Sequence, residues 1–209
     1  GGKFLKLILL RHGETYWNKE RRIQGGASDI ELSDVGKEQA DKLASLLRRE
    51  NISAVISSPL KRAMLTAKAV ADQDQLPVEV DDRLKELQVG QLEGVSASSL
   101  STTFSQFIMQ WWREGGLERL PDGESFVEVQ ERSWATIDRL LAEYKDKTVV
   151  VVCRYFAILQ INLKALDLPV EYFTKFRVDP SSMSILEFED YGTRLVKFND
   201  TSYLNYEHR

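Results

Sequence analysis

The run Thr-Val-Val-Val-Val-Cys at 148–153 is the sequence feature that most limits the fold. Four consecutive valines favour a strand, because β-branched side chains pack well on a pleated sheet. The run has no polar alternation, which indicates a strand buried on both faces. A second apolar run of strand length, at 4–10, lies near the start of the chain. Strands of this kind belong to mostly parallel sheets that are covered by helices on both faces.

Helical patterns alternate with strand patterns along the rest of the chain. We predict helices at 32–50, 59–73, 125–145 and 155–166, and further strands at 52–58 and 78–80. Ser33 and Ser125 are typical N-caps for the first and third of these helices. The apolar residues expected on the buried face of the first helix are Val35, Leu43, Leu46 and Leu47.

The end of the chain and one irregular segment complete the predicted architecture. Residues 182–190 and 193–200 flank a Tyr-Gly pair and predict a β-hairpin. We therefore expect an α/β fold, a three-layer α/β/α sandwich whose mostly parallel sheet has an antiparallel edge element. All 209 residues fit one domain. The segment at about 91–124 is predicted to be an insertion over the sheet's edge, of the kind that often acts as a lid.

Charge and composition exclude several classes of partner. A net charge of −4 and a pI near 5.4 argue against nucleic acid and against an anionic membrane, which both attract basic surfaces. A single cysteine excludes a disulfide framework and a cysteine-rich metal site, and no metal or cofactor motif is present. No apolar run reaches 18 residues, and the start lacks the shape of a secretory signal. We expect a cytoplasmic protein.

Charged side chains follow the predicted strands where a parallel sheet places its ligands, at the carboxyl ends. Arg11 and His12 end the first strand, and Arg62 lies shortly after the second. Glu86 follows the third strand, and Arg154 follows the valine run. Because guanidinium groups match the oxygens of phosphates and carboxylates, the arginines indicate an anion site.

Five stretches of the chain resemble the histidine phosphatase superfamily, also called the phosphoglycerate mutase-like family. LILLRHGETYWN at 7–18 resembles its Arg-His-Gly signature, and GGASDIELSDVGKEQA at 25–40 resembles a second family stretch. The other three are ISSPLKRAMLTA at 56–67, DDRLKELQVGQLEG at 81–94 and PDGES at 121–125. Their order and spacing agree over nearly the whole chain, and PDGES resembles the phosphatase branch.

The resemblance implies a role for each site residue. His12 would attack phosphorus and carry the phosphoryl group. Arg11 and Arg62 would hold the phosphate oxygens, and Glu86 would protonate the leaving oxygen and then activate water. Asn18 and Gln24 match polar positions that face substrate in the family. The last two are therefore expected to bind substrate, with no metal and no cofactor.

The chain departs from the family pattern after the valine run. The family has a second histidine there, and alignment places Arg154 on that position and Tyr155 on the glycine that follows it. The only other histidine, His208, lies next to the end of the chain and is expected to be a tail residue. Three outcomes stay open: arginine in the histidine's role, a slow enzyme, or a member that binds phosphate esters without turnover.

The neighbouring cysteine is expected to be a core residue and not a nucleophile. A cysteine phosphatase needs an arginine six residues after its cysteine, whereas Leu159 stands six residues after Cys153. The leading hypothesis is a phosphomonoester hydrolase acting on a sugar phosphate, a phosphoglycerate or an α-ribazole phosphate. The alternatives are a non-catalytic phosphate-ester-binding or regulatory protein and, less favoured, a phosphoglycerate mutase. A homodimer is compatible with the sequence.

Overall fold

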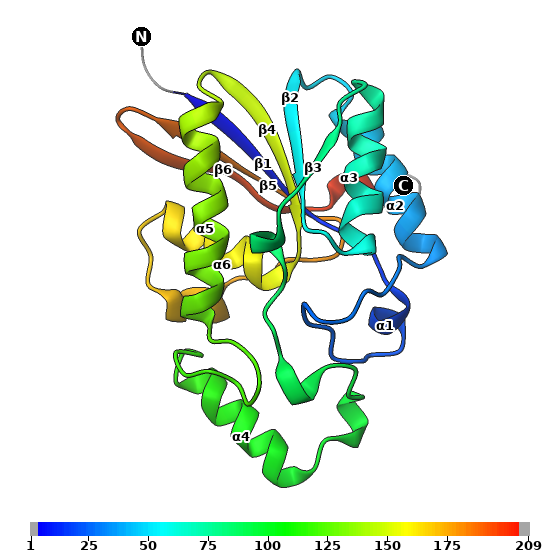
Figure 1. Cartoon of the computed structure of the whole chain (residues 1–209), viewed down its shortest axis with the longest axis vertical. Coiled ribbons are helices and arrows are strands. Elements are labelled where there is room, and N and C mark those ends of the chain that lie inside the picture. The colour runs from blue at the N-terminus through cyan, green and yellow to red at the C-terminus, as the bar shows by residue number, and fades with distance from the viewer. Residues whose placement is uncertain (1–3, 205–209) are drawn as a thin grey trace.

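The computed structural model describes residues 4–204, which form a six-stranded sheet between layers of helices (Figure 1). The strands are β1 (Leu5–Arg11), β2 (Ile52–Ser57), β3 (Val78–Val80), β4 (Lys147–Cys153), β5 (Met183–Glu189) and β6 (Gly192–Asp200). Their order is β3-β2-β4-β1-β5-β6. The first four in this order are parallel, whereas β5 and β6 are antiparallel to their neighbours. The predicted α/β fold with an antiparallel edge is confirmed.

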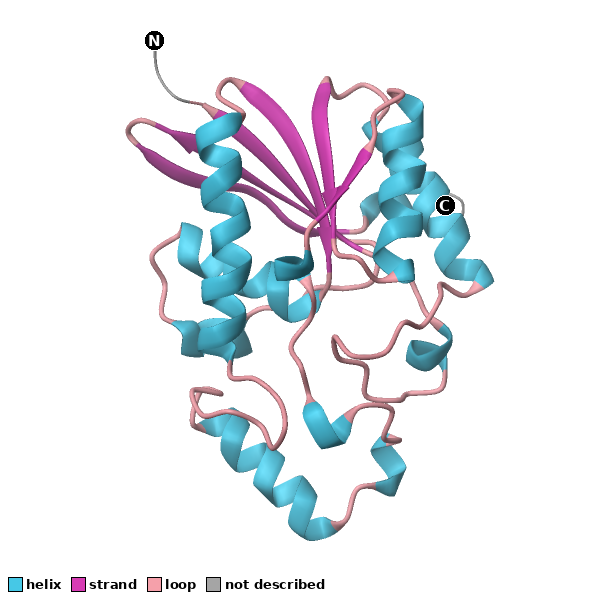
Figure 2. Ribbon diagram, viewed as in Figure 1, coloured by secondary structure: helices cyan, strands magenta, loops and turns pink. Residues whose placement is uncertain are grey.

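Alternate side chains of the central strands enter two separate cores, one on each face of the sheet. Leu7, Leu9 and Val151 belong to the core formed with α5 (Phe126–Glu143) and α6 (Tyr155–Ala165). Ile8 and Val152 belong to the core formed with α2 (Asp34–Leu47) and α3 (Lys61–Gln73). Figure 2 shows these helix pairs on either side of the sheet. The valine run is buried on both faces because each face meets a helical layer.

The predicted helix limits agree with the structure to within a few residues, and the side-chain oxygens of Ser33 and Ser125 accept N-cap hydrogen bonds as expected. Two details were wrong. Helix α3 begins at Lys61, whereas the sequence predicted that it begins at Pro59. On α2, Leu43 and Leu47 are buried, but Val35 and Leu46 are exposed. Small residues, Gly36, Ala40 and Ala44, fill the rest of the buried face instead.

Gly13 and Gly36 let the loop after β1 lie directly against α2. A Cβ atom on Gly36 would lie 2.1 Å from the carbonyl oxygen of Glu14. A Cβ on Gly13 would lie 2.8 Å from the carbonyl oxygen of Gly36. Any side chain at position 13 or 36 would therefore collide with the backbone where the loop after His12 contacts α2.

Several short elements lie between the strands. They are α1 (Tyr16–Lys19), α4 (Thr102–Arg113), η1 (Asp82–Leu84), η2 (Gly90–Leu92), η3 (Ala97–Ser99) and η4 (Val170–Lys175). The irregular segment at 91–124 contains α4 and lies beyond the carboxyl ends of the parallel strands (Figure 1). It therefore lies on the same side of the sheet as the predicted site residues.

Candidate active site

The register of the two central strands brings His12 and Arg154 together. In the parallel pair of β1 and β4, Arg11 lies opposite Cys153. The backbone N–H of His12 then donates to the carbonyl of Cys153 at 3.2 Å. His12 and Arg154 consequently leave the sheet side by side at its carboxyl edge.

His12 is held as a neutral imidazole with one free nitrogen. Its side chain is buried, and Nδ1 lies 2.9 Å from the carbonyl oxygen of Gly13. A carbonyl only accepts, so Nδ1 carries the proton and Nε2 carries the lone pair. Nε2 has no hydrogen-bond partner among the described residues. Burial lowers the pKa of His12 well below its usual value, and Arg62, Arg154 and Arg11 lower it further.

Arg62 reaches the site from the first turn of α3 and is almost completely buried. Its Nη1 donates to the carbonyl of Ser28 at 2.6 Å, and its Nη2 donates to that of Gly25 at 2.8 Å. The carboxylate of Glu93 in turn accepts from the N–H groups of Gly25 and Ser28 at 2.9 and 3.2 Å. Burial and the charge of Arg154 lower the pKa of Arg62 to about 10. The guanidinium is thus fixed by a loop that Glu93 holds.

Arg11 lies at the end of β1 with its guanidinium against the ring of Tyr155. Its Cζ is 5.4 Å from the ring centroid, and its Nη1 donates to the carbonyl of Val178. The Nε atom has no partner among the described residues. Burial and the charge of Arg154 lower the pKa of Arg11 to about 9. Because Tyr155 stands where the family pattern has glycine, this aromatic contact was not expected from the sequence.

Glu86 is buried with its carboxylate at the N-terminus of α6. Oε1 accepts from the backbone N–H groups of Leu87, Phe156 and Ala157 at 3.0, 3.1 and 3.2 Å. Oε2 also accepts from Phe156, at 3.1 Å. The first turn of a helix favours a carboxylate because its N–H groups are unpaired and its dipole is positive there. Backbone N–H groups therefore orient the Glu86 carboxylate.

Arg154 stands at the N-cap of α6 with a buried Nε that has no partner among the described residues. Its charge lowers the pKa values of Arg11, His12 and Arg62, and it lines the same cavity as Arg11. Burial lowers the pKa of Arg154 itself, while the carboxylate of Glu86 opposes that effect. The structure thus gathers three guanidinium groups around one imidazole.

The two predicted polar binders differ in their surroundings. Gln24 is buried, its Oε1 accepts from the Thr15 hydroxyl at 2.6 Å, and its Nε2 has no partner among the described residues. The Oδ1 of Asn18 accepts from the N–H and hydroxyl of Thr15, which closes the N-terminus of α1. Gln24 therefore keeps a free donor, whereas the Asn18 oxygen is used in capping.

A cavity of about 290 Å³ lies beside several of these residues. Its lining includes four of the seven predicted residues, Arg11, Gln24, Glu86 and Arg154, whereas His12, Arg62 and Asn18 are not part of it. The remaining lining residues are Arg22, Ile23, Val89, Trp112, Tyr155 and Phe156. The lining combines unpaired donors of Arg11, Gln24 and Arg154 with aromatic rings, which suits an anion that carries an organic group.

The aromatic residues in the cavity lining were not predicted from the sequence. Trp112 comes from α4, and its ring centroid lies 6.0 Å from that of Phe156. The paired tryptophans of the 91–124 segment were the available signal, but nothing in the sequence distinguished the two. Trp111 is buried and donates to the carbonyl of Glu118, whereas Trp112 is partly exposed and faces the cavity.

Cys153 lies in the core, as expected. It is buried, and burial raises the pKa of its thiol above the usual range. It does not line the cavity. Among residues 4–204, no group of three or more His, Cys, Asp and Glu side chains is placed to hold a metal ion.

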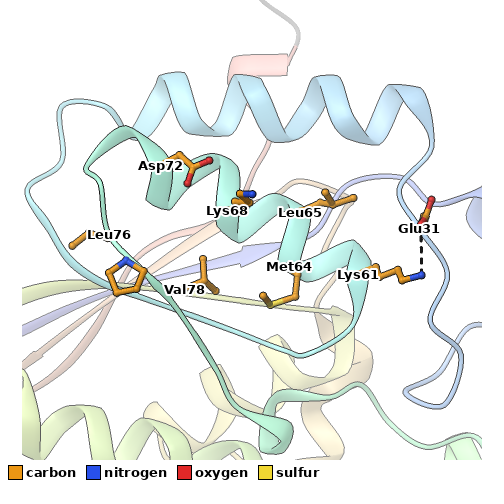
Figure 3. Close-up of a pocket in the computed structure, with 9 residues that line it drawn as sticks. Glu31, Lys61, Met64, Leu65, Lys68, Asp72, Leu76 and Val78 are labelled. Atoms are coloured by element: carbon orange, nitrogen blue, oxygen red, sulfur yellow. Dashed lines mark ion pairs between the residues drawn. The ribbon is translucent and has the colours of Figure 1, made fainter.

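A second cavity, of about 440 Å³, lies between α3 and β3 (Figure 3). Apolar side chains such as Met64, Leu65 and Val78 line it, together with Lys61 and Lys68. None of the predicted site residues is part of its lining. The candidate active site is therefore the smaller, arginine-lined cavity.

Comparison with known proteins gives consistent similarities. Residues 7–201 match the histidine phosphatase superfamily (branch 1). The chain is 32% identical over 200 residues to phosphoserine phosphatase 1 of Hydrogenobacter thermophilus, covering 96% of this chain and 94% of that protein. It is 34% identical over 186 residues to a probable phosphoglycerate mutase of Yersinia pestis, covering 89% and 86%. A solved mycobacterial glucosyl-3-phosphoglycerate phosphatase is 28% identical with a TM-score of 0.86, covering 96% and 100%.

Proposed function

The chain belongs to the histidine phosphatase superfamily, and we propose that it hydrolyses phosphomonoesters through a phosphohistidine formed on His12. It is a phosphatase of small phosphorylated metabolites. One observation carries the proposed mechanism: a buried, neutral His12 offers a free Nε2 among three guanidinium groups. A nucleophile must be unprotonated, and its phosphate target must be bound by cations, so the two features support each other.

In the first step, Nε2 of His12 attacks phosphorus and the bond from phosphorus to the ester oxygen breaks. Glu86 gives its proton to the departing oxygen, which leaves as an alcohol. Arg11, Arg62 and Arg154 hold the nonbridging oxygens, whose charge is spread in the transition state. The Gly13 carbonyl accepts from Nδ1 and stabilises the imidazole as it gains positive character.

In the second step, the Glu86 carboxylate takes a proton from water, and the resulting hydroxide attacks phosphorus. The bond from phosphorus to Nε2 breaks, which returns a neutral His12 and releases inorganic phosphate. The same carboxyl group therefore serves as acid and then as base. Its buried position at the cavity wall supports both tasks.

We propose that Arg154 takes the place of the second family histidine. Its location beside His12 and its unpaired, buried Nε support this role. An arginine stays charged and offers several donors to phosphate oxygens. It also disfavours protonation of His12, since a second positive charge nearby is repelled.

The substrate is proposed to be a small phosphorylated metabolite, with Gln24 and Asn18 contacting its polar groups. Sugar phosphates, phosphoglycerates and α-ribazole phosphate are the classes that we propose. A mutase is the second candidate, because one relative is named a probable phosphoglycerate mutase. A mutase returns the phosphoryl group to an alcohol, whereas a phosphatase gives it to water.

We propose that the chain is one cytoplasmic domain in which the segment 91–124 acts as a lid. The position of Trp112 in the cavity wall supports the lid. In the described part of the chain, no helix is long and apolar enough to cross a membrane.

The decisive experiment incubates the protein with phosphoserine, 3-phosphoglycerate and p-nitrophenyl phosphate from pH 5 to 8. We expect release of inorganic phosphate by the wild type and none by His12→Ala. Formation of 2-phosphoglycerate without phosphate release would favour the mutase. Binding of phosphate without turnover by the wild type would favour the non-catalytic alternative.

A further inference from the structure

Arg132 on α5 contacts the segment that carries Glu86. Its Nη1 donates to the carbonyl of Arg83 at 2.8 Å and to that of Lys85. Its Nη2 donates to the carbonyl of Glu86 itself at 3.0 Å. One guanidinium group thus holds three backbone carbonyls within four residues. A hydrogen bond from a charged donor is stronger than one between neutral groups. The three bonds therefore hold residues 83–86 firmly against α5.

Glu124, from the PDGES stretch, fixes the other edge of the same guanidinium. Its Oε2 accepts from Nε of Arg132 at 2.9 Å, and its Oε1 accepts from Nη2 at 2.8 Å. Such a two-point contact sets both the position and the plane of the arginine. Burial raises the pKa of Glu124, but the hydrogen bonds from Arg132 outweigh it, so the pKa lies below its usual value. The Glu124 carboxylate is therefore charged at neutral pH.

Glu124 also binds the far end of the segment. The N–H of Gln88 donates to its Oε1 at 2.9 Å, and its own N–H donates to the carbonyl of Gln88 at 2.8 Å. Glu86 is therefore held between carbonyls fixed by Arg132 on one side and a residue fixed by Glu124 on the other. Neither Arg132 nor Glu124 lines the arginine-rich cavity.

We propose that Arg132 and Glu124 form a clamp that positions Glu86 for proton transfer. The clamp holds the 83–88 backbone so that the Glu86 carboxyl keeps its contacts with the N–H groups of Phe156 and Ala157. Proton transfer needs the acid within hydrogen-bond reach of the leaving oxygen, and small displacements are costly. Arg132 and Glu124 are positioning residues, since they act through Glu86. The inference rests on the proposed function, in which Glu86 is the acid.

The test compares two esters that differ in their need for an acid. Phosphoserine has an alkoxide leaving group and needs protonation, whereas p-nitrophenyl phosphate releases a stable phenolate. We expect Arg132→Gln to lower kcat/KM for phosphoserine by about 30-fold or more and that for p-nitrophenyl phosphate by less than about threefold. Because kcat/KM covers the chemistry only up to phosphohistidine formation, the second step does not obscure the result. An equal loss on both esters, or no loss on either, would overturn the proposal.

Arg139→Gln is the matched control. Arg139 lies on the same helix and forms ion pairs with Glu79 at 3.0 Å and Glu143 at 3.0 Å, but it donates to none of the carbonyls that Arg132 holds. We expect it to keep the wild-type ratio between the two esters. Glu124→Gln keeps the shape of the clamp and removes its charge, so it should change the ratio in the same direction by a smaller factor. It serves if Arg132→Gln does not fold.

Amide hydrogen exchange of residues 83–88 gives a readout that needs no activity. The clamp predicts faster exchange there in Arg132→Gln than in the wild type and in Arg139→Gln. Unchanged exchange would overturn the clamp even if the wild type hydrolysed neither ester. Absence of hydrolysis by the wild type, with faster exchange in the variant, would instead reject the proposed function and keep the clamp.

Discussion

At the scale of single residues, His12 is uncharged because charging it would be doubly unfavourable. A buried imidazolium would lose its hydration, and it would lie near Arg11, Arg62 and Arg154. The same three charges would attract the anionic oxygens of a phosphate ester. The arrangement that keeps the nucleophile reactive is therefore the arrangement that binds its target.

The neutrality of His12 predicts how stability depends on pH. The unfolded chain takes up a proton at His12 below about pH 6.5, whereas the folded chain, with its lowered pKa, does not. Stability therefore falls as the pH drops. We expect His12→Asn, which cannot be protonated there, to remove up to about 1.5 kcal/mol of the loss in unfolding free energy between pH 6.5 and pH 5. Urea unfolding of both proteins at the two pH values measures the difference. Equal losses in the two proteins would show that folded His12 takes up a proton in this range.

The residues that sequence reasoning gathered at the site share one property: each follows a parallel strand. Arg11 ends β1, and His12 and Arg154 come directly after buried strands, so the register of the sheet brings them together. The contact between the Tyr155 ring and Arg11 could not be predicted in this way, because it depends on side-chain direction and not on strand order. The catalytic and binding roles of these residues stay predictions, those of Asn18 and Gln24 included. His208, expected to be a tail residue, lies outside the described residues.

At the scale of elements, the strands and long helices could be predicted because their hydrophobic patterns extend over many residues. The wrong assignments of Val35 and Leu46 arose because small residues form the contact face of α2. A face of glycine and alanine packs closely but gives a weak apolar pattern. The helices α1 and α4 were not predicted: α1 is a single turn of four residues, and α4 lies in a segment that its serines and glycines made look irregular.

Helix α4 should influence which esters the site accepts. Trp112 packs at right angles to Phe173, with 4.6 Å between ring centroids, and lines the cavity. An aromatic contact contributes about 0.5–1.5 kcal/mol, so Trp112→Ala should raise KM for an aromatic ester such as naphthyl phosphate by roughly threefold to tenfold. KM for phosphoserine, which has no apolar group, should change little. Trp112→Phe is the control, and an equal rise for both esters would place the effect on phosphate binding instead.

At the scale of the whole molecule, two helical layers bury the central strands, and the predicted site residues lie at the carboxyl ends of these strands. Strand alternation and the continuous valine run were sufficient to predict the three layers. For residues 91–124 the sequence predicted only an insertion over the sheet's edge, because none of the named strands of the sheet comes from that segment. Its place beyond the strand ends follows from contacts such as that of Trp112 with Phe173. The overall fold can thus be predicted from local sequence patterns. The residues that line the cavity are instead set by contacts between segments that are far apart in the sequence.

Three guanidinium groups gathered at one edge impose a cost on the whole fold. Arg154 is disfavoured by burial, and its charge also opposes those of Arg11 and Arg62. We expect Arg154→Gln to raise the free energy of unfolding without phosphate by about 1 kcal/mol or more, because a buried charge is replaced by a neutral polar group.

Inorganic phosphate should reverse this order of stability. It binds only the folded protein, and at about 100 times its Kd it stabilises the wild type by about 2.7 kcal/mol. The variant, which has lost one donor, should gain much less at the same concentration. Thermal unfolding of both proteins, with and without phosphate, measures the crossing. A variant that is less stable without phosphate would show that the buried charge of Arg154 does not destabilise the fold. A variant that gains as much from phosphate as the wild type would show that this charge is not directed at the bound anion.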